Sequence, residues 1–80
     1  MIIRINRGSI MVSLHEKTIT IAGEMFFPPN DKIGFLLYSA SLKQWDHPHQ
    51  DIALTADDIA RIIADIRQGF ESGGHTLEVV

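Results

Sequence analysis

The chain of 80 residues contains no cysteine and no apolar run that approaches the ~20 residues of a transmembrane helix. Without cysteine there is no disulfide, no thiol nucleophile and no thiolate metal site, and small secreted domains usually depend on disulfides. The first residues, Met1–Asn6, are too few and too soon charged for a signal peptide. These absences predict a cytoplasmic protein with no membrane partner.

Positive charge is also scarce, because 7 Lys and Arg face 10 Asp and Glu and leave a net charge of −3. Domains that bind nucleic acid usually carry a basic patch that neutralises phosphates, so we expect no direct nucleic-acid partner. The acidic excess lies in residues 46–80, with seven acidic and two basic residues (−5), against five basic and three acidic in residues 1–45 (+2). Such a surface speeds encounter with a basic partner, and it is equally compatible with a solvated helix face.

Motifs of catalysis are missing as well. The serines lack a nucleophile elbow, the glycines follow no phosphate-loop pattern, and no Ser-His-Asp arrangement is visible. Asp57, Asp58 and Asp65 lie on the polar face of a predicted helix, whereas acid–base catalysis needs a buried carboxyl or a close like charge. We therefore expect no enzymatic activity and no cofactor.

The first pattern along the sequence is the period-two alternation that is typical of strands. Residues 2–23 alternate branched apolar and polar side chains, which is typical of strands with one buried and one solvated face. Short connections at Arg7-Gly8 and Glu16-Lys17 require antiparallel neighbours, so this part predicts a three-stranded meander. Residues 33–38 predict a fourth strand and residues 76–80 a last one. Residues 24–31, with the pair Pro28-Pro29, predict a loop or a strand edge.

A helix is predicted after Thr55, which is a good N-cap and forms a capping-box pattern with Asp58. Gly73-Gly74 is a strong stop signal. Between them one apolar stripe recurs at helical spacing, at Ile59, Ile62, Ile63, Ile66 and Phe70. The order β-β-β-β-α-β predicts one α+β domain over residues 1–80. We expect an antiparallel sheet of about five strands with one long C-terminal helix packed on one face.

The segment Asp46-His47-Pro48-His49 raises the possibility of a metal site, together with Asp51 and His75. Two imidazoles at i and i+2 can face one ion, but zinc usually takes four ligands and no second, suitably spaced pair is present. The alternative is a proline-stiffened polar loop whose histidines face solvent. We assign no metal site.

Trp45, the only tryptophan, allows two interpretations. It could be a binding hot spot, since tryptophan supplies a large contact area and a polar N–H at interfaces. It could equally lock the long loop onto the sheet. Both roles are compatible if the ring anchors a loop that meets a partner.

The run from Tyr38 to His49, YSASLKQWDHPH, resembles the immunity protein 74 family. The family pattern has a lysine or similar residue just before Trp-Asp-x-Pro-His, then a capped helix, a glycine and a short final strand. Here it is matched by Lys43, Trp45–His49, Thr55, Gly74 and Thr76–Val79, and an early Asn6-Arg7-Gly8 turn extends the likeness over nearly the whole chain. The stretch from Glu24 to Lys32 is less regular than the family pattern. The resemblance implies a non-enzymatic bacterial protein that binds and neutralises a cognate polymorphic toxin, often a nuclease, inside the producing cell.

For toxin binding we predict contacts from the 40–51 loop and from the acidic helix face, through Trp45, Asp46, His47, His49, Asp57, Asp58 and Asp65. Two other hypotheses stay open. One is a structural or regulatory module that forms a homodimer through an exposed strand edge, which concentration-dependent size-exclusion behaviour would reveal. The other is a metal-binding protein that uses His47 and His49, which a zinc-dependent melting temperature would reveal.

Overall fold

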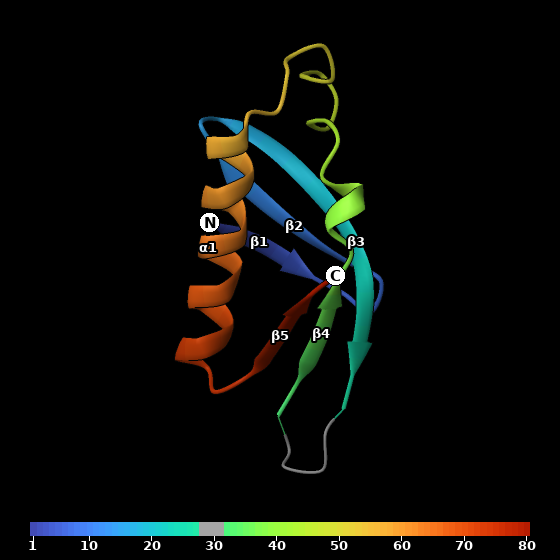
Figure 1. Ribbon diagram of the computed structural model, residues 1–80, viewed down its shortest axis with the longest axis vertical. Coiled ribbons are helices and arrows are strands. Elements are labelled where there is room, and N and C mark those ends of the chain that lie inside the picture. The colour runs from blue at the N-terminus through green and yellow to red at the C-terminus, as the bar shows by residue number, and fades with distance from the viewer. Residues whose placement is uncertain (28–31) are drawn as a thin grey trace.

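The computed structural model describes residues 1–27 and 32–80. Its elements are five strands, a short 3-10 helix and one long α-helix: β1 (Ile2–Ile5), β2 (Ser9–Leu14), β3 (Lys17–Phe26), β4 (Gly34–Leu37), η1 (Ser39–Ser41), α1 (Ala56–Ser72) and β5 (Thr76–Val79). Figure 1 shows α1 lying along one face of a twisted sheet, and the chain between η1 and α1 arching over one end of the molecule. The predicted α+β fold and its order of elements are confirmed.

The sheet has the strand order β1-β2-β3-β4-β5. The first four strands are antiparallel to their neighbours, as the short connections predict, but β5 lies parallel to β4. A parallel pair requires a crossover, and the long loop followed by α1 is that crossover. The sheet is therefore mixed, with β1 and β5 as its two edges.

Strand β3 is longer than the sequence predicts, because it continues through Gly23 to Phe26 and pairs there with β4. Gly23 is a point of close approach rather than a strand end. A Cβ atom at this position would overlap the Leu36 carbonyl oxygen and the Phe35 ring. Glycine inside a strand often marks such an approach of a neighbouring backbone. The predicted turn at Pro28–Asp31 lies outside the described residues.

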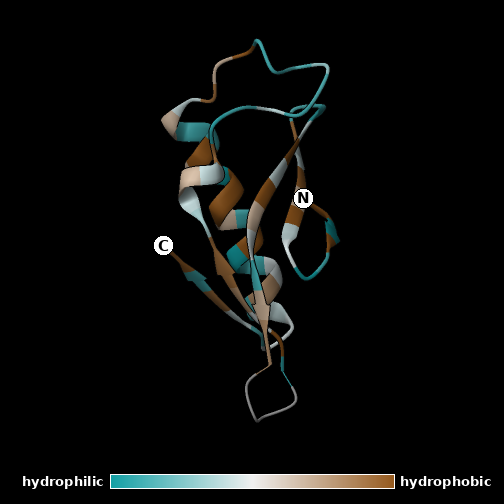
Figure 2. Ribbon diagram, turned by 90° about the vertical axis from the view of Figure 1, so that its right-hand side faces the viewer, coloured by the Kyte–Doolittle hydropathy of each residue, from teal (hydrophilic) through white to brown (hydrophobic). Residues whose placement is uncertain are grey.

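The core fills the space between the sheet and α1. Phe35 and Phe70 meet edge to face, with ring centroids 6.3 Å apart, which is a favourable aromatic geometry. The predicted stripe of α1 is confirmed, since it supplies buried side chains to this core. The buried apolar residues are Ile10, Val12, Ile19, Ile21, Phe35, Leu37, Leu42, Trp45, Ile62, Ile66 and Phe70. In Figure 2 the loop between η1 and α1 is by contrast largely hydrophilic.

Both ends of α1 follow the predicted signals. The Asp58 N–H donates to Thr55 Oγ1 at 3.0 Å, and the Thr55 N–H donates to Asp58 Oδ2 at 3.2 Å, which completes a capping box. After the helix, Gly74 has φ +74°, a conformation that glycine adopts without strain. Within the described parts of the chain, no helix is long and apolar enough to cross a membrane.

Candidate functional site: the Trp45 loop and its polar hollow

The segment that follows β4 takes the place of a strand beside the first half of β3. Strand β4 pairs with residues 23–26 of β3, so the edge of residues 17–22 opposite β2 is left to other groups. There the Tyr38 N–H donates to the Ala22 carbonyl at 3.0 Å, the Ala22 N–H to Ser41 Oγ at 3.0 Å, and the Asp46 N–H to the Thr18 carbonyl at 2.9 Å. Because backbone groups of a strand need partners, these bonds fix the loop to the sheet.

The Asp46 carboxylate strengthens this attachment. It accepts hydrogen bonds from Thr20 Oγ1 at 2.8 Å, from the Thr20 N–H at 3.3 Å and from Thr18 Oγ1 at 3.4 Å. Hydrogen bonds to a charged acceptor are among the stronger ones in proteins. Asp46 is half-buried, and its carboxylate faces β3. Its contact with a partner stays a prediction.

Trp45 occupies the core and has an exposed fraction of 0%. Lys17 Nζ lies 5.2 Å from the centroid of the ring, a cation–π distance. Trp45 Nε1 is buried without a hydrogen-bond partner in the described part of the chain. Of the two interpretations of Trp45, the structure shows the one in which the ring fixes the loop to the sheet. The ring holds the loop from inside, and a contact of Trp45 with a partner stays a prediction.

The two histidines of the loop differ in exposure. His47 is exposed, and its Nδ1 lies 3.2 Å from Gln50 Nε2, while its peptide bond to Pro48 is cis. His49 is half-buried, and its N–H donates to the Asp46 carbonyl at 2.9 Å in a tight turn. Both belong to the chain between η1 and α1, which lies at the end of the molecule where α1 begins (Figure 1).

His75, the third histidine of the metal hypothesis, is far from this loop. It follows the other end of α1, whose 17 residues span about 25 Å, and its Nδ1 accepts from the Ile33 N–H at 2.9 Å. Across the residues that the structure describes, no group of three His, Cys, Asp or Glu side chains is arranged to hold a metal ion.

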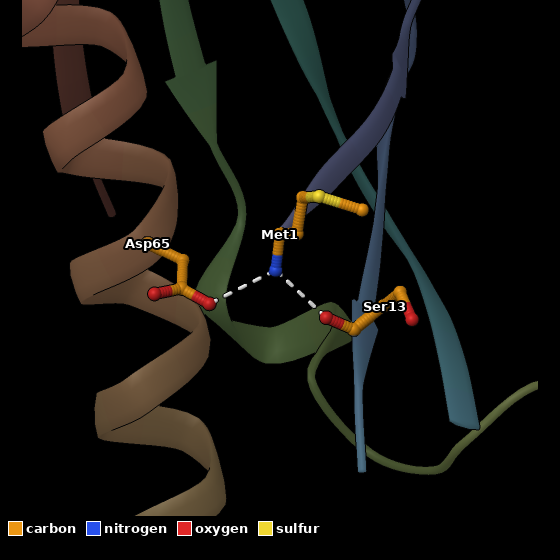
Figure 3. A network of polar contacts seen from close by, with 3 residues as sticks. All are labelled: Met1, Ser13 and Asp65. Atoms are coloured by element: carbon orange, nitrogen blue, oxygen red, sulfur yellow. Dashed lines mark hydrogen bonds and ion pairs between the residues drawn. The ribbon is translucent and has the colours of Figure 1, made fainter. Parts of the chain in front are cut away.

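The three predicted acidic residues of α1 have different surroundings. Asp57 is exposed in the first turn, beside the loop, and Asp58 forms the capping box. Asp65 lies two turns further along and forms an ion pair of 3.0 Å with the Met1 ammonium. Figure 3 shows this ammonium also donating to the Ser13 carbonyl, at 2.7 Å. The structure thus groups Asp57 and Asp58 with the loop and places Asp65 against the start of β1.

A polar hollow of about 570 Å³ opens between η1, the Trp45 segment and β3. It lies where the loop bridges the edge of β3 between its contacts at Ser41 and Asp46. The residues that line it are Thr20, Ser41, Lys43, Gln44, Trp45, Asp46, His47 and Gln50. Sequence reasoning missed Lys43, Gln44 and Gln50 as candidates, and their only sequence signal is their place beside Trp45–His49.

One further side chain near this edge has an altered acidity. Partial burial raises the pKa of the Tyr38 phenol, and the Glu24 carboxylate raises it further through its charge and a hydrogen bond. Tyr38 is therefore a neutral hydrogen-bonding group at physiological pH.

These features describe a small α+β domain with a polar loop held firmly at one end. Comparison with known families identifies it further, because the sequence model of immunity protein 74 matches residues 2–80. The chain therefore belongs to the immunity protein 74 family, as the resemblance predicted. Neither the search of curated proteins nor that of solved structures finds a match. Proteins of this kind generally act without catalysis, on a toxin partner.

Proposed function

We propose that this protein binds a cognate bacterial toxin and neutralises it without catalysis, in the cytoplasm of the cell that makes both. The observation that carries the proposal is the family match over residues 2–80. The attachment of the 38–46 segment to β3 supports it, because a loop that is already ordered loses little conformational entropy on binding.

A nuclease is the toxin class that fits the charge of the chain best. Enzymes that act on nucleic acid carry basic surfaces that attract phosphates. The charge of −5 in residues 46–80 would attract such a surface, and four of the seven acidic residues there belong to the loop or to the first turn of α1: Asp46, Asp51, Asp57 and Asp58. Steering acts on the rate of association more than on the final affinity.

The predicted contact residues divide into two groups in this proposal. His47 and Asp57 are exposed at the loop end and would touch the toxin directly, with the half-buried His49 at the margin. Three further residues contribute indirectly, because their side chains hold the loop and the first turn of α1 in place: Trp45, Asp46 and Asp58. Asp65 contributes through its charge.

The test is to express this chain together with the toxin domain encoded beside it. We expect the two to co-purify as a stable complex, and the chain to restore growth of cells that produce the toxin. His47→Ala and Asp57→Asn should weaken the complex without unfolding the protein, because both side chains are exposed. A toxin that neither binds nor is neutralised would contradict the proposal.

A further inference from the structure

The polar groups around the hollow beside Trp45 differ in how many hydrogen bonds they already make within the protein. Two of the hollow's acceptors are occupied. The Asp46 carboxylate takes three hydrogen bonds from Thr18 and Thr20. The Ser41 hydroxyl donates to the Tyr38 carbonyl at 2.7 Å and accepts from the Ala22 N–H. What remains for a ligand must come from the other lining residues.

Among those other residues, Lys43 offers donors alone. Lys43 and Gln44 are exposed on the wall of the hollow. Among residues 1–27 and 32–80, the Lys43 ammonium has neither an acidic partner nor an acceptor. An ammonium has three donors and no acceptor, whereas the Gln44 amide adds two donors and one carbonyl oxygen that accepts. It is the Lys43 ammonium that makes the hollow suited to an acceptor group.

The local charge points the same way, although the whole chain is acidic. Lys17 lies over the Trp45 ring and Lys43 lines the hollow, whereas Asp46 is the one carboxylate among the lining residues. Lys43 and Asp46 thus balance each other in formal charge, but the Asp46 carboxylate is taken up by two threonines of β3, whereas the Lys43 ammonium has no such partner in the part of the chain that the structure describes. The ammonium favours an anionic side chain, and the net charge of −3 on the chain disfavours a nucleic acid, whose phosphates would be repelled.

We propose that the hollow seats a carboxylate side chain, Asp or Glu, of the toxin, held by the Lys43 ammonium and the Gln44 amide. This inference rests on the proposed function, because it takes the toxin as the source of the carboxylate. The volume of about 570 Å³ lies within the roughly 300–1,000 Å³ of ligand pockets. The acidic residues of α1 set the rate of encounter, and the hollow fixes the register of the complex.

The test compares lysine and arginine variants in binding to the toxin domain encoded beside this chain, measured by titration calorimetry. Lys43→Met removes the charge and keeps the length of the side chain, and we expect it to raise Kd by about tenfold or more. Lys43→Arg should keep most of the affinity. Arg67→Met is the matched control, since it removes one positive charge from an exposed position on α1 outside the hollow.

A second readout needs no substitution in the hollow. Trp45 borders the hollow and is the only tryptophan, so its single indole N–H resonance should shift when the toxin binds. The same resonance in Lys43→Met shows whether that variant is folded.

The outcomes separate the two proposals. Equal Kd values for Lys43→Met and the wild type would overturn the carboxylate site and leave the immunity function intact. Equal weakening by Lys43→Met and Arg67→Met would also overturn it, because net charge alone would explain the loss. A wild-type protein that does not bind the toxin overturns both proposals. Lys43-dependent binding of a DNA or RNA oligonucleotide would assign the hollow to phosphate instead.

Discussion

At the scale of single residues, Asp46 connects the loop to β3 with its carboxylate as well as its backbone N–H. Thr18 and Thr20, its partners, stand two residues apart and so point to the same side of β3. The charged group is half-buried, and the donors around it replace the water that a free carboxylate would bind. Asp46 thus makes its hydrogen bonds within the protein, although it belongs to an exposed loop.

Replacing Asp46 by Ala should lower the free energy of unfolding by about 1.5–3 kcal/mol, the usual worth of hydrogen bonds to a charged group. Chemical denaturation followed by the fluorescence of Trp45 measures this loss. Asp51→Asn is the control, since Asp51 is exposed in the same loop and should stay within about 0.5 kcal/mol of the wild type. Equal stability of the two variants would contradict the role assigned to Asp46.

Tyr38 gives a prediction about alkaline pH. The folded protein raises the pKa of this phenol, and it does so by disfavouring the phenolate. The stabilisation is therefore complete below the unfolded pKa of about 10 and is lost as the pH rises through the higher folded pKa. Tyr38 is the only tyrosine, so the ultraviolet absorbance of the phenolate titrates it alone.

The Glu24→Gln variant supplies the control for that titration. It removes the negative charge beside the phenol, and the titration midpoint should move back toward the ordinary value. A midpoint that stays where it is in the wild type would show that burial alone causes the shift.

At the scale of elements, β3 connects the two halves of the sheet. Residues 17–22 of β3 pair with β2, and its last four residues pair with β4. The loop therefore supplies hydrogen-bond partners only beside the first half of β3. Gly23 stands at the start of the β4 pairing, under the Phe35 ring and the Leu36 carbonyl. The pairing of β4 with β3 thus begins where ring and backbone atoms leave no room for a Cβ atom.

Gly23→Ala should destabilise the fold by about 3 kcal/mol, because a methyl group there meets a backbone carbonyl and a buried ring, neither of which can move away cheaply. Thermal unfolding followed by circular dichroism measures the effect. The same substitution at Gly8 meets nothing within 4 Å and should change stability little. If both variants melt alike, β3 and β4 do not pack as described.

At the scale of the whole molecule, the elements could be predicted because each depends on local signals. The capping box at Thr55 and Asp58 and the stripe through Ile62, Ile66 and Phe70 act within a few residues of chain. The parallel partner of β5 and the continuation of β3 past Gly23 depend on contacts between distant segments, which periodicity does not report.

The candidate site was less accessible to sequence reasoning for the same reason. Trp45, Asp46, His47 and His49 stand out because of their residue types, yet their types do not tell which side chains face inward. Which side chains face inward depends on Thr18 and Thr20, which lie 28 and 26 residues before Asp46 in sequence. The hollow depends on it too, since it exists only when the loop bridges the edge of β3.

Long-range charge gives the prediction for the whole complex. Asp65→Asn should slow association with the toxin and flatten its dependence on salt, with little change in the dissociation rate, because Asp65 acts at a distance. Stopped-flow measurements at several salt concentrations test this. Its ion pair with the Met1 ammonium is exposed on the Met1 side, so the stability should fall by less than about 1 kcal/mol.

The inward attachment of the loop also bears on how such proteins diversify. The fixed points of the segment, at Ser41, Trp45 and Asp46, use side chains that face the sheet or the core. The neighbouring outward positions Gln44, His47 and Gln50 carry little of the folding energy because they are exposed. Under the proposed function, substitutions at those outward positions would change the surface offered to a toxin while the scaffold stays the same.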